Sequence, residues 1–345
     1  MRECGSAVKP MVYIVILNWN GWQHTLECLE SVFRLKYPHY RVVVCDNAST
    51  DCSMERICEC ANGSLKARTP EQEELREMVE PHVAKPIHYA EMGRREAEKG
   101  GRAFSTDASL YLVQTGDNLG FAGGCNVGLR FALSRRDAEY VWILNNDTVV
   151  SAAALDELLE SMSDPQVGIC GSTLVYYNQP DRVQALGGGT YNPWVGFAKS
   201  AGEFSRMPDA ILDGRKPHID YVHGASMLVS RAFLESVGLM TEEFFLYFEE
   251  LDWACRAKGR FRLGYAPQSI VYHKEGATIG TGGDASGRSK LSDYYMVRNR
   301  FRINRKYFPL ALLTLYLWAP VMLMNRAVRG QWDKLGGVIR AALWR

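Results

Sequence analysis

Three clusters of polar residues follow short apolar runs and supply the groups most able to bind a ligand. They lie at residues 18–21, 46–51 and 145–147, and each begins where an apolar run ends. Open parallel sheets bind ligands beyond the carboxyl ends of their strands, so the clusters would share one rim if these runs are parallel strands. Asn and Asp also cap helices and turns. Capping explains one such cluster easily, but three together favour a binding site.

The first cluster restricts the kind of ligand. Residues 18–22 read Asn-Trp-Asn-Gly-Trp and contain no G-x-G-x-x-G, the motif that lets backbone amides approach a pyrophosphate. A nicotinamide enzyme is therefore disfavoured, although Asp46 stands where a dinucleotide-binding acid would. Asn18 and Asp46 could still hold a nucleotide through its base and ribose.

A fourth cluster combines aromatic and acidic residues. Glu249, Glu250 and Asp252 follow the aromatic residues of 245–248, and three carboxylates in four residues are costly to bury unless they are used. On a helix Glu249 and Asp252 share a face, and Asp252 could pair with Arg256 one turn later. The helix dipole also favours an acidic helix start. Both a catalytic and a structural role are open for this cluster.

The elements that would position these residues alternate along the chain. Unbroken apolar strands between helices indicate a parallel sheet covered on both faces, and hence an α/β domain. The expected strands are 12–17, 41–45, 110–113, 140–144, 167–176, 261–265 and 269–273. The expected helices lie near 26–33, 121–133, 152–162 and 248–258.

Three segments interrupt this alternation. Residues 54–106 are rich in Glu, Arg and Lys and contain three prolines, which predicts a helical or partly mobile insertion between the second and third strands. Residues 187–204 are rich in Gly and aromatic residues, which predicts hairpins or loops. The composition of residues 280–287 predicts a flexible loop, either a lid or a linker.

The 345-residue chain has a net charge of +1, but its charges are unevenly distributed. Residues 296–345 contain ten Lys and Arg and one Asp, whereas residues 1–295 contain 30 basic and 38 acidic residues. This excludes a uniformly basic nucleic-acid-binding protein and leaves a basic end to explain. Nine scattered cysteines without C-x-x-C predict reduced thiols, and the N-terminal residues lack the apolar core of a signal peptide. We therefore expect a cytoplasmic location.

The basic end combines apolar and cationic residues. Between Lys306 and Arg326 lie 19 uncharged residues, just enough to span a bilayer, although two prolines weaken that interpretation. Residues 332–342 have the pattern of a basic amphipathic helix, which lies in the interface of anionic lipids. Interfacial attachment is favoured over a spanning helix and over packing on the rest of the chain or on a partner.

The motifs at these strand ends resemble those of family 2 glycosyltransferases with the GT-A fold, and especially their rhamnosyltransferase-like branch. They are ILNWN at 16–20, VVCDNASTD at 43–51, NLGFAGGCNVG at 118–128 and LNND at 144–147. The resemblance covers roughly residues 13–309 without the insertion. It implies a nucleotide-sugar-binding GT-A domain at 11–290, with the insertion at 54–106. The charge and apolar pattern of the basic end adds a helical, membrane-associating region at 291–345.

The resemblance also implies roles for single residues. A divalent metal, Mg2+ or Mn2+, would be held by Asp147 and His273, with Asn145 at the family's first acidic position. Glu250 would be the base that deprotonates the acceptor hydroxyl, with Glu249 and Asp252 as alternatives. The residues implied for the nucleotide are Asn18, Asp46, Asn118, Asn126, Asn146 and Asp147. Those implied for the acceptor are Trp194, Glu249, Asp252 and Arg298, although Trp194 could equally be a core residue and Arg298 a solvent-facing cation.

The implied function is the transfer, with inversion, of a sugar from a nucleotide diphosphate sugar to a glycan or polyprenyl-linked glycan. A dTDP-rhamnose donor is favoured over a UDP-hexose. The enzyme would act in cell-surface polysaccharide synthesis, at the inner face of the cell membrane. No nucleic-acid partner is expected.

Three alternatives to this function differ in their support. Asn145 in the metal motif favours a catalytically idle glycan-binding or scaffold subunit of a membrane glycan-assembly complex. A processive polysaccharide synthase is disfavoured because Q-x-x-R-W is absent, and a nucleotidyltransferase because the first strand lacks its Gly-rich loop.

Overall fold

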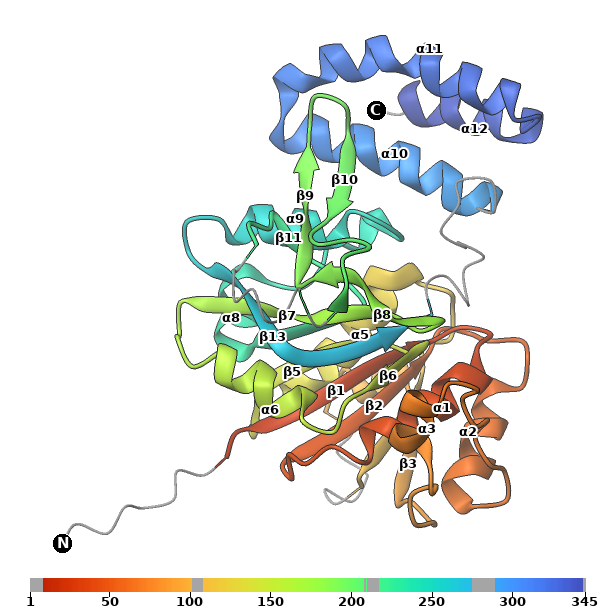
Figure 1. Cartoon of the computed structure of the whole chain (residues 1–345), viewed down its shortest axis with the longest axis vertical. Coiled ribbons are helices and arrows are strands. Elements are labelled where there is room, and N and C mark those ends of the chain that lie inside the picture. The colour runs from red at the N-terminus through yellow and green to blue at the C-terminus, as the bar shows by residue number, and fades with distance from the viewer. Residues whose placement is uncertain (1–8, 101–107, 208, 210–216, 275–288, 344–345) are drawn as a thin grey trace, which may run out of the picture.

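Ten strands form one mixed sheet with helices on both faces (Figure 1). The structure, a computed structural model, describes residues 9–100, 108–207, 209, 217–274 and 289–343. The strand order is β3-β4-β2-β1-β5-β12-β7-β13-β6, with β8 paired to β7. The expected α/β fold with a large, mostly parallel central sheet is confirmed. The loop expected at 280–287 lies outside the described residues.

The first half of the sheet is parallel and carries the polar strand ends. Asn18 is in register with Asp46, and Leu17 with Asn145, so the clusters meet at one edge. The four strands expected here are present. A fifth, β3, was not predicted because its residues are only partly apolar. The strands are β1 (Met11–Asn18), β2 (Tyr40–Asp46), β3 (Tyr89–Gly93), β4 (Leu110–Gln114) and β5 (Ala138–Asn145).

The second half of the sheet mixes directions. β12 (Ser226–Ser230) is antiparallel to both β5 and β7 (Val167–Tyr176), and β13 (Arg262–His273) is parallel to β7. The prediction of two strands at 261–265 and 269–273 is wrong, because one strand continues through a shift in register between residues 266 and 270. Pro267 has no N–H to donate, so pairing is interrupted there while the chain stays extended. The remaining strands are β6 (Thr148–Val150) and β8 (Gln179–Leu186).

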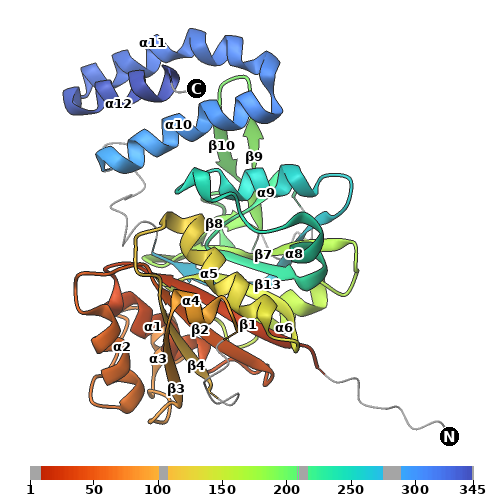
Figure 2. The ribbon, with the colours of Figure 1, turned by 180° about the vertical axis from the view of Figure 1, so that it is seen from behind.

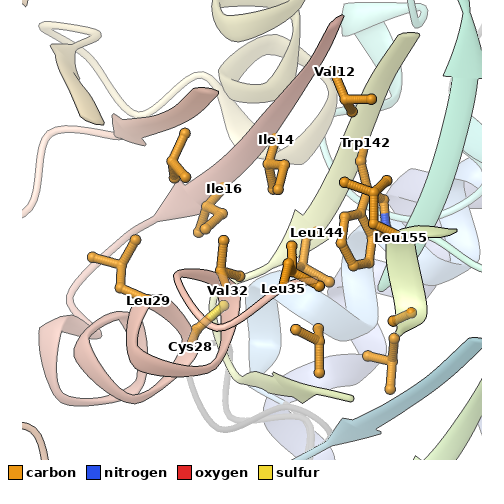
Figure 3. Close-up of a cluster of buried hydrophobic side chains, with 14 of the residues drawn as sticks. Val12, Ile14, Ile16, Cys28, Leu29, Val32, Leu35, Trp142, Leu144 and Leu155 are labelled. Carbon is orange, nitrogen blue, oxygen red and sulfur yellow. The ribbon is translucent and has the colours of Figure 1, made fainter. Parts of the chain in front are cut away.

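Alternate residues of β1 face two separate cores. Ile14 packs in the core with α1 (Trp22–Val32) and Trp142 (Figure 3). Val15 belongs to the other core, under α5 (Gly120–Ser134), which Figure 2 shows on the opposite face. Both helices are those that the apolar spacing predicts. Further helices are α6 (Ala154–Ser161), α8 (Arg231–Val237) and α9 (Glu249–Ala257).

The insertion after β2 is folded and extends the sheet. It contains α2 (Ser53–Asn62), α3 (Glu73–Val79), β3 and α4 (Arg94–Ala97), with residues 101–107 not described. Its strand β3 pairs in parallel with β4 and becomes the edge of the sheet. The eight cysteines of the described residues are free thiols, as expected.

A small hairpin sheet and three helices form a layer at one end of the molecule (Figure 1). The hairpin is β9 (Gly188–Asn192) and β10 (Phe197–Ser200), with β11 (Tyr221–Val222) beside β9. The helices are α10 (Lys290–Tyr307), α11 (Leu312–Val328) and α12 (Trp332–Leu343), and the 3-10 turn Pro309–Ala311 precedes α11. α10 begins at the boundary expected near residue 290, but the division into a catalytic domain and a membrane region stays a prediction.

Glycines let α5 approach the sheet closely. A Cβ at Gly124 would overlap Leu17, and a Cβ at Gly128 would overlap Val15 and lie 3.1 Å from Cys45 Sγ. These two glycines are one turn apart and face the strands. The N-terminal end of α5 is thereby held against the strand ends that carry the polar clusters.

We predict that Gly128→Ala destabilises the protein by about 1–3 kcal/mol, although alanine is the better helix former. The added methyl overpacks a rigid strand, and this outweighs a helix-propensity gain of about 1 kcal/mol. The measurement is the denaturant midpoint of unfolding. Gly336→Ala in α12 is the control, because no atom lies within 4 Å of its Cβ position and it should be neutral or stabilising. Equal shifts in the two variants would contradict close packing at Gly128.

Candidate active site

A cleft of about 410 Å³ lies beyond the carboxyl ends of β1 and β5. Its polar wall consists of strand-end residues, and the opposite wall consists of aromatic and apolar residues. The polar wall includes Asn47, Asn118, Asn145, Asn146, Asp147, Gln184, His223 and His273. The opposite wall includes Phe121, Tyr221, Phe245, Leu246, Tyr247, Phe248, Leu291 and Met296, with Glu249 and Glu250 among them.

Asn18 joins the three polar clusters by hydrogen bonds. Its amide donates to Asp46 Oδ1 at 2.7 Å, and its Oδ1 accepts from Asn146 Nδ2 at 3.3 Å. The clusters therefore converge as the sequence predicts. Asn18 and Asp46 are buried and do not line the cleft, whereas their chain neighbours Trp19 and Asn47 do.

Asn47 is the residue of the second cluster that reaches the cleft. Its Nδ2 donates to Asn118 Oδ1 and to Gly120 O, both at 3.1 Å, and its Oδ1 accepts from Leu119 N at 3.0 Å. These bonds fix the start of α5 beside the strand ends. The sequence analysis assigned Asn118 to the site but missed Asn47. The signal was present, because Asn47 lies inside the same motif as Asp46.

Asp147 and His273 face each other in the cleft. Asp147 Oδ1 lies 3.2 Å from His273 Nε2, both side chains are almost fully buried, and no described group makes a well-aligned hydrogen bond to this oxygen. Gln184 Oε1 accepts from His273 Nδ1 at 2.9 Å, which turns Nε2 toward the carboxylate. Burial would raise the pKa of Asp147, but the facing His273 outweighs it and lowers that pKa. A carboxylate and an imidazole so placed share either a proton or a cation.

Few side chains that could ligate a metal lie at the Asp147–His273 pair. No group of three or more His, Cys, Asp or Glu side chains that could hold a metal occurs in the described parts of the chain. Asn145 places its Nδ2 3.4 Å from His273 Nε2, where an aspartate would add a second carboxylate. A carboxylate and an imidazole are both groups that coordinate divalent cations, so this pair is suited to contribute two of a cation's ligands.

Glu250 faces the cleft at the start of α9. A Cβ at Gly224 would overlap Glu250 Oε1, and the Gly224 backbone forms a hydrogen bond with the carboxylate. Burial raises the pKa of Glu250 to about 7 in spite of this bond. Glu249 is only 2% exposed and its Oε2 lacks a partner among the described groups. Burial, and then the neighbouring Glu250, raise the pKa of Glu249 well above its ordinary value, so the site favours the protonated form of this carboxyl.

The segment before α9 has a strained backbone. Phe245, Tyr247 and Phe248 have φ angles of 64°, 69° and 72°, which bulky residues rarely adopt. Asn299 of α10 is fully buried and donates to the carbonyls of residues 244, 246 and 247 at 2.8, 2.7 and 3.0 Å. Strain of this kind persists only where the surrounding structure enforces it. Asn299 therefore holds the aromatic wall of the cleft in shape.

Asp252 is not among the residues that line the cleft, and the acceptor role considered for it stays a prediction. Its Oδ1 accepts from Lys306 Nζ at 2.7 Å and from Tyr307 OH at 2.8 Å, and its Oδ2 from Thr241 Oγ1 at 2.6 Å and Arg256 Nε at 3.0 Å. Burial would raise the pKa of Asp252, but these donors outweigh it and lower that pKa. Asp252 joins α9 to α10, and the pairing with Arg256 follows the helical spacing.

Three other predicted residues also lie away from the lining of the cleft. Asn126 is buried and exchanges hydrogen bonds with the backbone of Met240 at 2.9 and 3.1 Å. Trp194 is exposed beyond β9 in the hairpin, which extends toward α11. Arg298 donates to the carbonyl of Phe244 at 3.0 Å and lies over the Tyr295 ring. Asn126 and Arg298 thus contact backbone carbonyls outside the cleft, Trp194 lies at the surface, and none of the three lines the cleft.

Comparison with known sequences agrees with the motifs. Residues 102–238 match the family described as Glycosyl transferase family 2. A low-salt glycan biosynthesis hexosyltransferase from Haloferax volcanii is 26% identical over 208 residues, covering 60% of this chain and 64% of that protein. The dTDP-rhamnosyl transferase RfbF from Shigella flexneri is also 26% identical over 208 residues, covering 59% of this chain and 66% of RfbF. This chain thus covers slightly less than two thirds of either relative.

Solved structures are similar in fold. A mannosyltransferase from Pyrobaculum calidifontis, in complex with GDP-Man and Mn2+, superposes with a TM-score of 0.51 at 16% identity, covering 97% of this chain and 88% of that one. GalNAc-T7 with UDP, GalNAc and Mn2+ also gives 0.51, at 14% identity, over 85% of this chain and 51% of its own.

The fold is therefore of the GT-A class. The sequence matches confirm the expected resemblance to family 2 glycosyltransferases and to their rhamnosyltransferase-like branch.

We predict that Asn299→Asp destabilises the protein by at least ~2 kcal/mol, because a carboxylate cannot donate to the three carbonyls and one or more is left buried without a partner. Denaturant midpoints measure the effect. Asn325→Asp is the matched control, since Asn325 is exposed on α11 and the substitution has the same size and charge. The assignment fails if the two variants unfold at the same midpoint.

Proposed function

We propose that this chain is a metal-dependent, inverting glycosyltransferase that uses a nucleotide diphosphate sugar. The observation that carries the proposal is that Glu250 and the Asp147–His273 pair line the same cleft of a GT-A fold. One is a carboxyl whose pKa burial raises to about 7, and the other is a pair suited to a cation. An inverting sugar transfer needs both functions on opposite sides of the anomeric carbon.

The donor is proposed to bind on the polar wall. Asn47, Asn118 and Asn146 offer amides to the nucleotide, and buried Asp46 and Asn18 hold that wall from behind. A divalent cation held by Asp147 and His273 supplies positive charge to the departing diphosphate. Rhamnose from a dTDP donor is the favoured sugar because RfbF carries that activity in its name, and UDP-hexoses are the second candidate.

The acceptor is proposed to bind on the aromatic wall. Its hydroxyl oxygen attacks the anomeric carbon while the bond to the diphosphate breaks, and the nucleoside diphosphate leaves with the electron pair. Glu250 takes the hydroxyl proton, with Gly224 fixing the position of the carboxylate. Glu249 lines the cleft and its Oε2 has no partner among the described groups, so this carboxyl, when protonated, can donate a hydrogen bond to a sugar hydroxyl.

The acceptor class and the location follow the same proposal. Glycan or polyprenyl-linked glycan acceptors suit the aromatic lining of the cleft and the Haloferax relative, whose name places it in glycan biosynthesis. The inner face of the cell membrane is the proposed location, with attachment through residues 291–345. That region contains the one helical stretch of the described chain, Pro309–Val328, that is long and apolar enough to cross a membrane.

A second candidate function is favoured by Asn145. This residue replaces a carboxylate at the cation site, which would suit a catalytically idle subunit that binds glycan in a membrane assembly complex. Titration calorimetry with Mn2+ and dTDP- or UDP-sugars separates the two candidates, because an idle subunit would bind none of these nucleotides.

We predict that release of nucleoside diphosphate rises with pH through about 7, by close to tenfold per unit below it, and that Glu250→Gln abolishes this dependence. Ionised Glu250 accepts the proton, and its pKa is raised to about 7, so the active fraction grows as the pH rises. The variant should lose about 10²–10⁴-fold in kcat while its affinity for the donor is kept. Initial rates with Mn2+ at saturating donor and acceptor measure both effects.

Glu249→Gln is the matched control for this measurement. Gln matches Glu249 in size and has the charge of its protonated form, which burial favours here, so the pH midpoint should stay close to that of the wild type. A wild-type rate that does not change between pH 6 and pH 8, or normal turnover in Glu250→Gln, would refute Glu250 as the base.

We predict that Asn145→Asp binds Mn2+ at least about tenfold more tightly than the wild type in the absence of nucleotide, because a second carboxylate raises the affinity of a hard-cation site. Titration calorimetry with Mn2+ alone measures this. Asn118→Asp adds the same charge to the same cleft away from the pair, and its oxygen can still accept from Asn47 and Gly120. If Asn118→Asp tightens Mn2+ binding as much, the Asp147–His273 pair is not the cation site.

A further inference from the structure

Helix α11 is apolar on both of its long faces. Leu315 is fully buried on the inner face, in a cluster with Val297 and Phe301 of α10. The outer face is also apolar but exposed, and we call it the α11 outer face. Its residues are Leu310, just before the helix, and Leu313, Leu317, Val321, Met324 and Val328. A helix that is hydrophobic all round is normally covered on all sides.

The exposure of these side chains is large. Leu313 and Leu317 are 73% and 75% exposed, and Val328 is 81% exposed. Scattered exposed leucines are ordinary on protein surfaces, but an unbroken stripe along a five-turn helix marks an interaction surface. We therefore expect a binding partner to cover the α11 outer face.

The tip of the β9–β10 hairpin continues the apolar stripe. Trp194 and Phe197 are 52% and 59% exposed, and the carbonyl of Trp194 accepts from Thr314 Oγ1 at 2.6 Å. Gly196 lies so close to Leu315 and Arg300 that a Cβ there would overlap both. Figures 1 and 2 both show the hairpin reaching the helical layer. Two segments more than a hundred residues apart thus present aromatic and aliphatic side chains at one end of the molecule.

α11 is fastened along α10 and does not project from the protein. Arg326, near the end of α11, makes a two-bond ion pair with Asp293, near the start of α10, at 2.7 and 2.9 Å. Both side chains are mostly buried. Insertion of α11 across a bilayer would separate this pair and expose the cluster around Leu315. The contacts therefore favour a helix that lies in the plane of a surface.

Charge complementarity identifies the occupant. Residues 296–345 carry ten Lys and Arg and one Asp; Lys306 and Arg326 pair with aspartates inside the protein, whereas Arg329 and Arg340 are exposed in this layer. Exposed aromatic residues, Trp318 and Trp332, accompany the aliphatic stripe. A membrane interface binds tryptophan and apolar side chains, and anionic lipids attract basic residues by about 1 kcal/mol each.

We infer that the α11 outer face and the hairpin tip form one docking surface that lies in the plane of an anionic lipid bilayer. Trp194 thereby acquires a role in lipid contact in place of sugar contact. The hairpin is common to the surface and the cleft, since Ala198 of β10 lines the cleft. Leu291 and Met296 of α10, the helix on which α11 packs, line the cleft as well. This arrangement brings the acceptor side of the cleft next to the membrane. If the proposed function holds, it suits an acceptor whose head group extends from a lipid.

The test is flotation of the full chain with vesicles of phosphatidylcholine alone or mixed with phosphatidylglycerol. The wild type should float with the mixed vesicles, more weakly with phosphatidylcholine, and less as salt increases. Leu313→Glu with Leu317→Glu should reduce binding at least about tenfold, because two side chains lose their apolar burial. Trp194→Ser with Phe197→Ser should weaken binding as well. Equal binding to both vesicle types, or no effect of either pair, would overturn the inference.

The control variant places the same two negative charges elsewhere. Ser163→Glu with Gln166→Glu lies in the loop between α6 and β7, at exposed positions far from the helical layer, and should bind like the wild type. Release of nucleoside diphosphate from donor in solution should be unchanged in the α11 pair, which shows that it folds. If no variant or wild type releases nucleoside diphosphate, the proposed function fails while the flotation result still stands.

Two further outcomes would overturn the inference. Resistance of the bound protein to alkaline carbonate extraction would show that α11 spans the bilayer. Sedimentation velocity that shows a wild-type dimer, converted to a monomer by the α11 pair without vesicle binding in either, would show that the surface joins two copies of the chain.

Discussion

The shape of the cleft depends on how α10 holds the segment that leads into α9. Asn299 satisfies three carbonyls of a strained aromatic loop, and Lys306 and Tyr307 bind Asp252 just past the proposed base. Positive φ angles at bulky residues cost free energy, so this loop keeps its shape only while α10 is docked. Glu250 lies between these two anchor points. Its position is therefore set by a helix that lies outside the sheet.

The polar wall of the cleft, which includes Asn145 and Asn146, is positioned by the sheet. Its polar residues come from parallel strands in register, where Asn18 pairs with Asp46 and the backbone places Asn145 beside Leu17. Hydrogen bonds among buried Asn18, Asp46 and Asn146 then fix the wall without any part of α10. The wall proposed for the donor is thus built by the sheet. The wall proposed for the acceptor is held by a helix docked from outside the sheet.

Much of this arrangement could be predicted from sequence, because it depends on local patterns. Apolar runs give the parallel strands, and polar residues at their ends converge for geometric reasons that hold for any parallel sheet. The roles of single side chains were harder to predict. Asp252 and Asn126 carry the same polar groups as site residues, but their partners are 54 residues or more than 100 residues away. Sequence spacing contains nothing about such long-range partners. The single strand β13 was split in the prediction because Pro267 interrupts its pattern but not its course.

The uneven charge of the chain now has a structural counterpart. Most of the basic residues near the end of the sequence are carried by α10, α11 and α12, and some of them are used internally, as Lys306 is at Asp252 and Arg326 at Asp293. Others, such as Arg329 and Arg340, remain exposed in the same helical layer. One face of α10 therefore positions the proposed base, and another supports the proposed docking surface. α10 thus contacts both the loop before Glu250 and helix α11, through Asn299 on one side and Asp293 on the other.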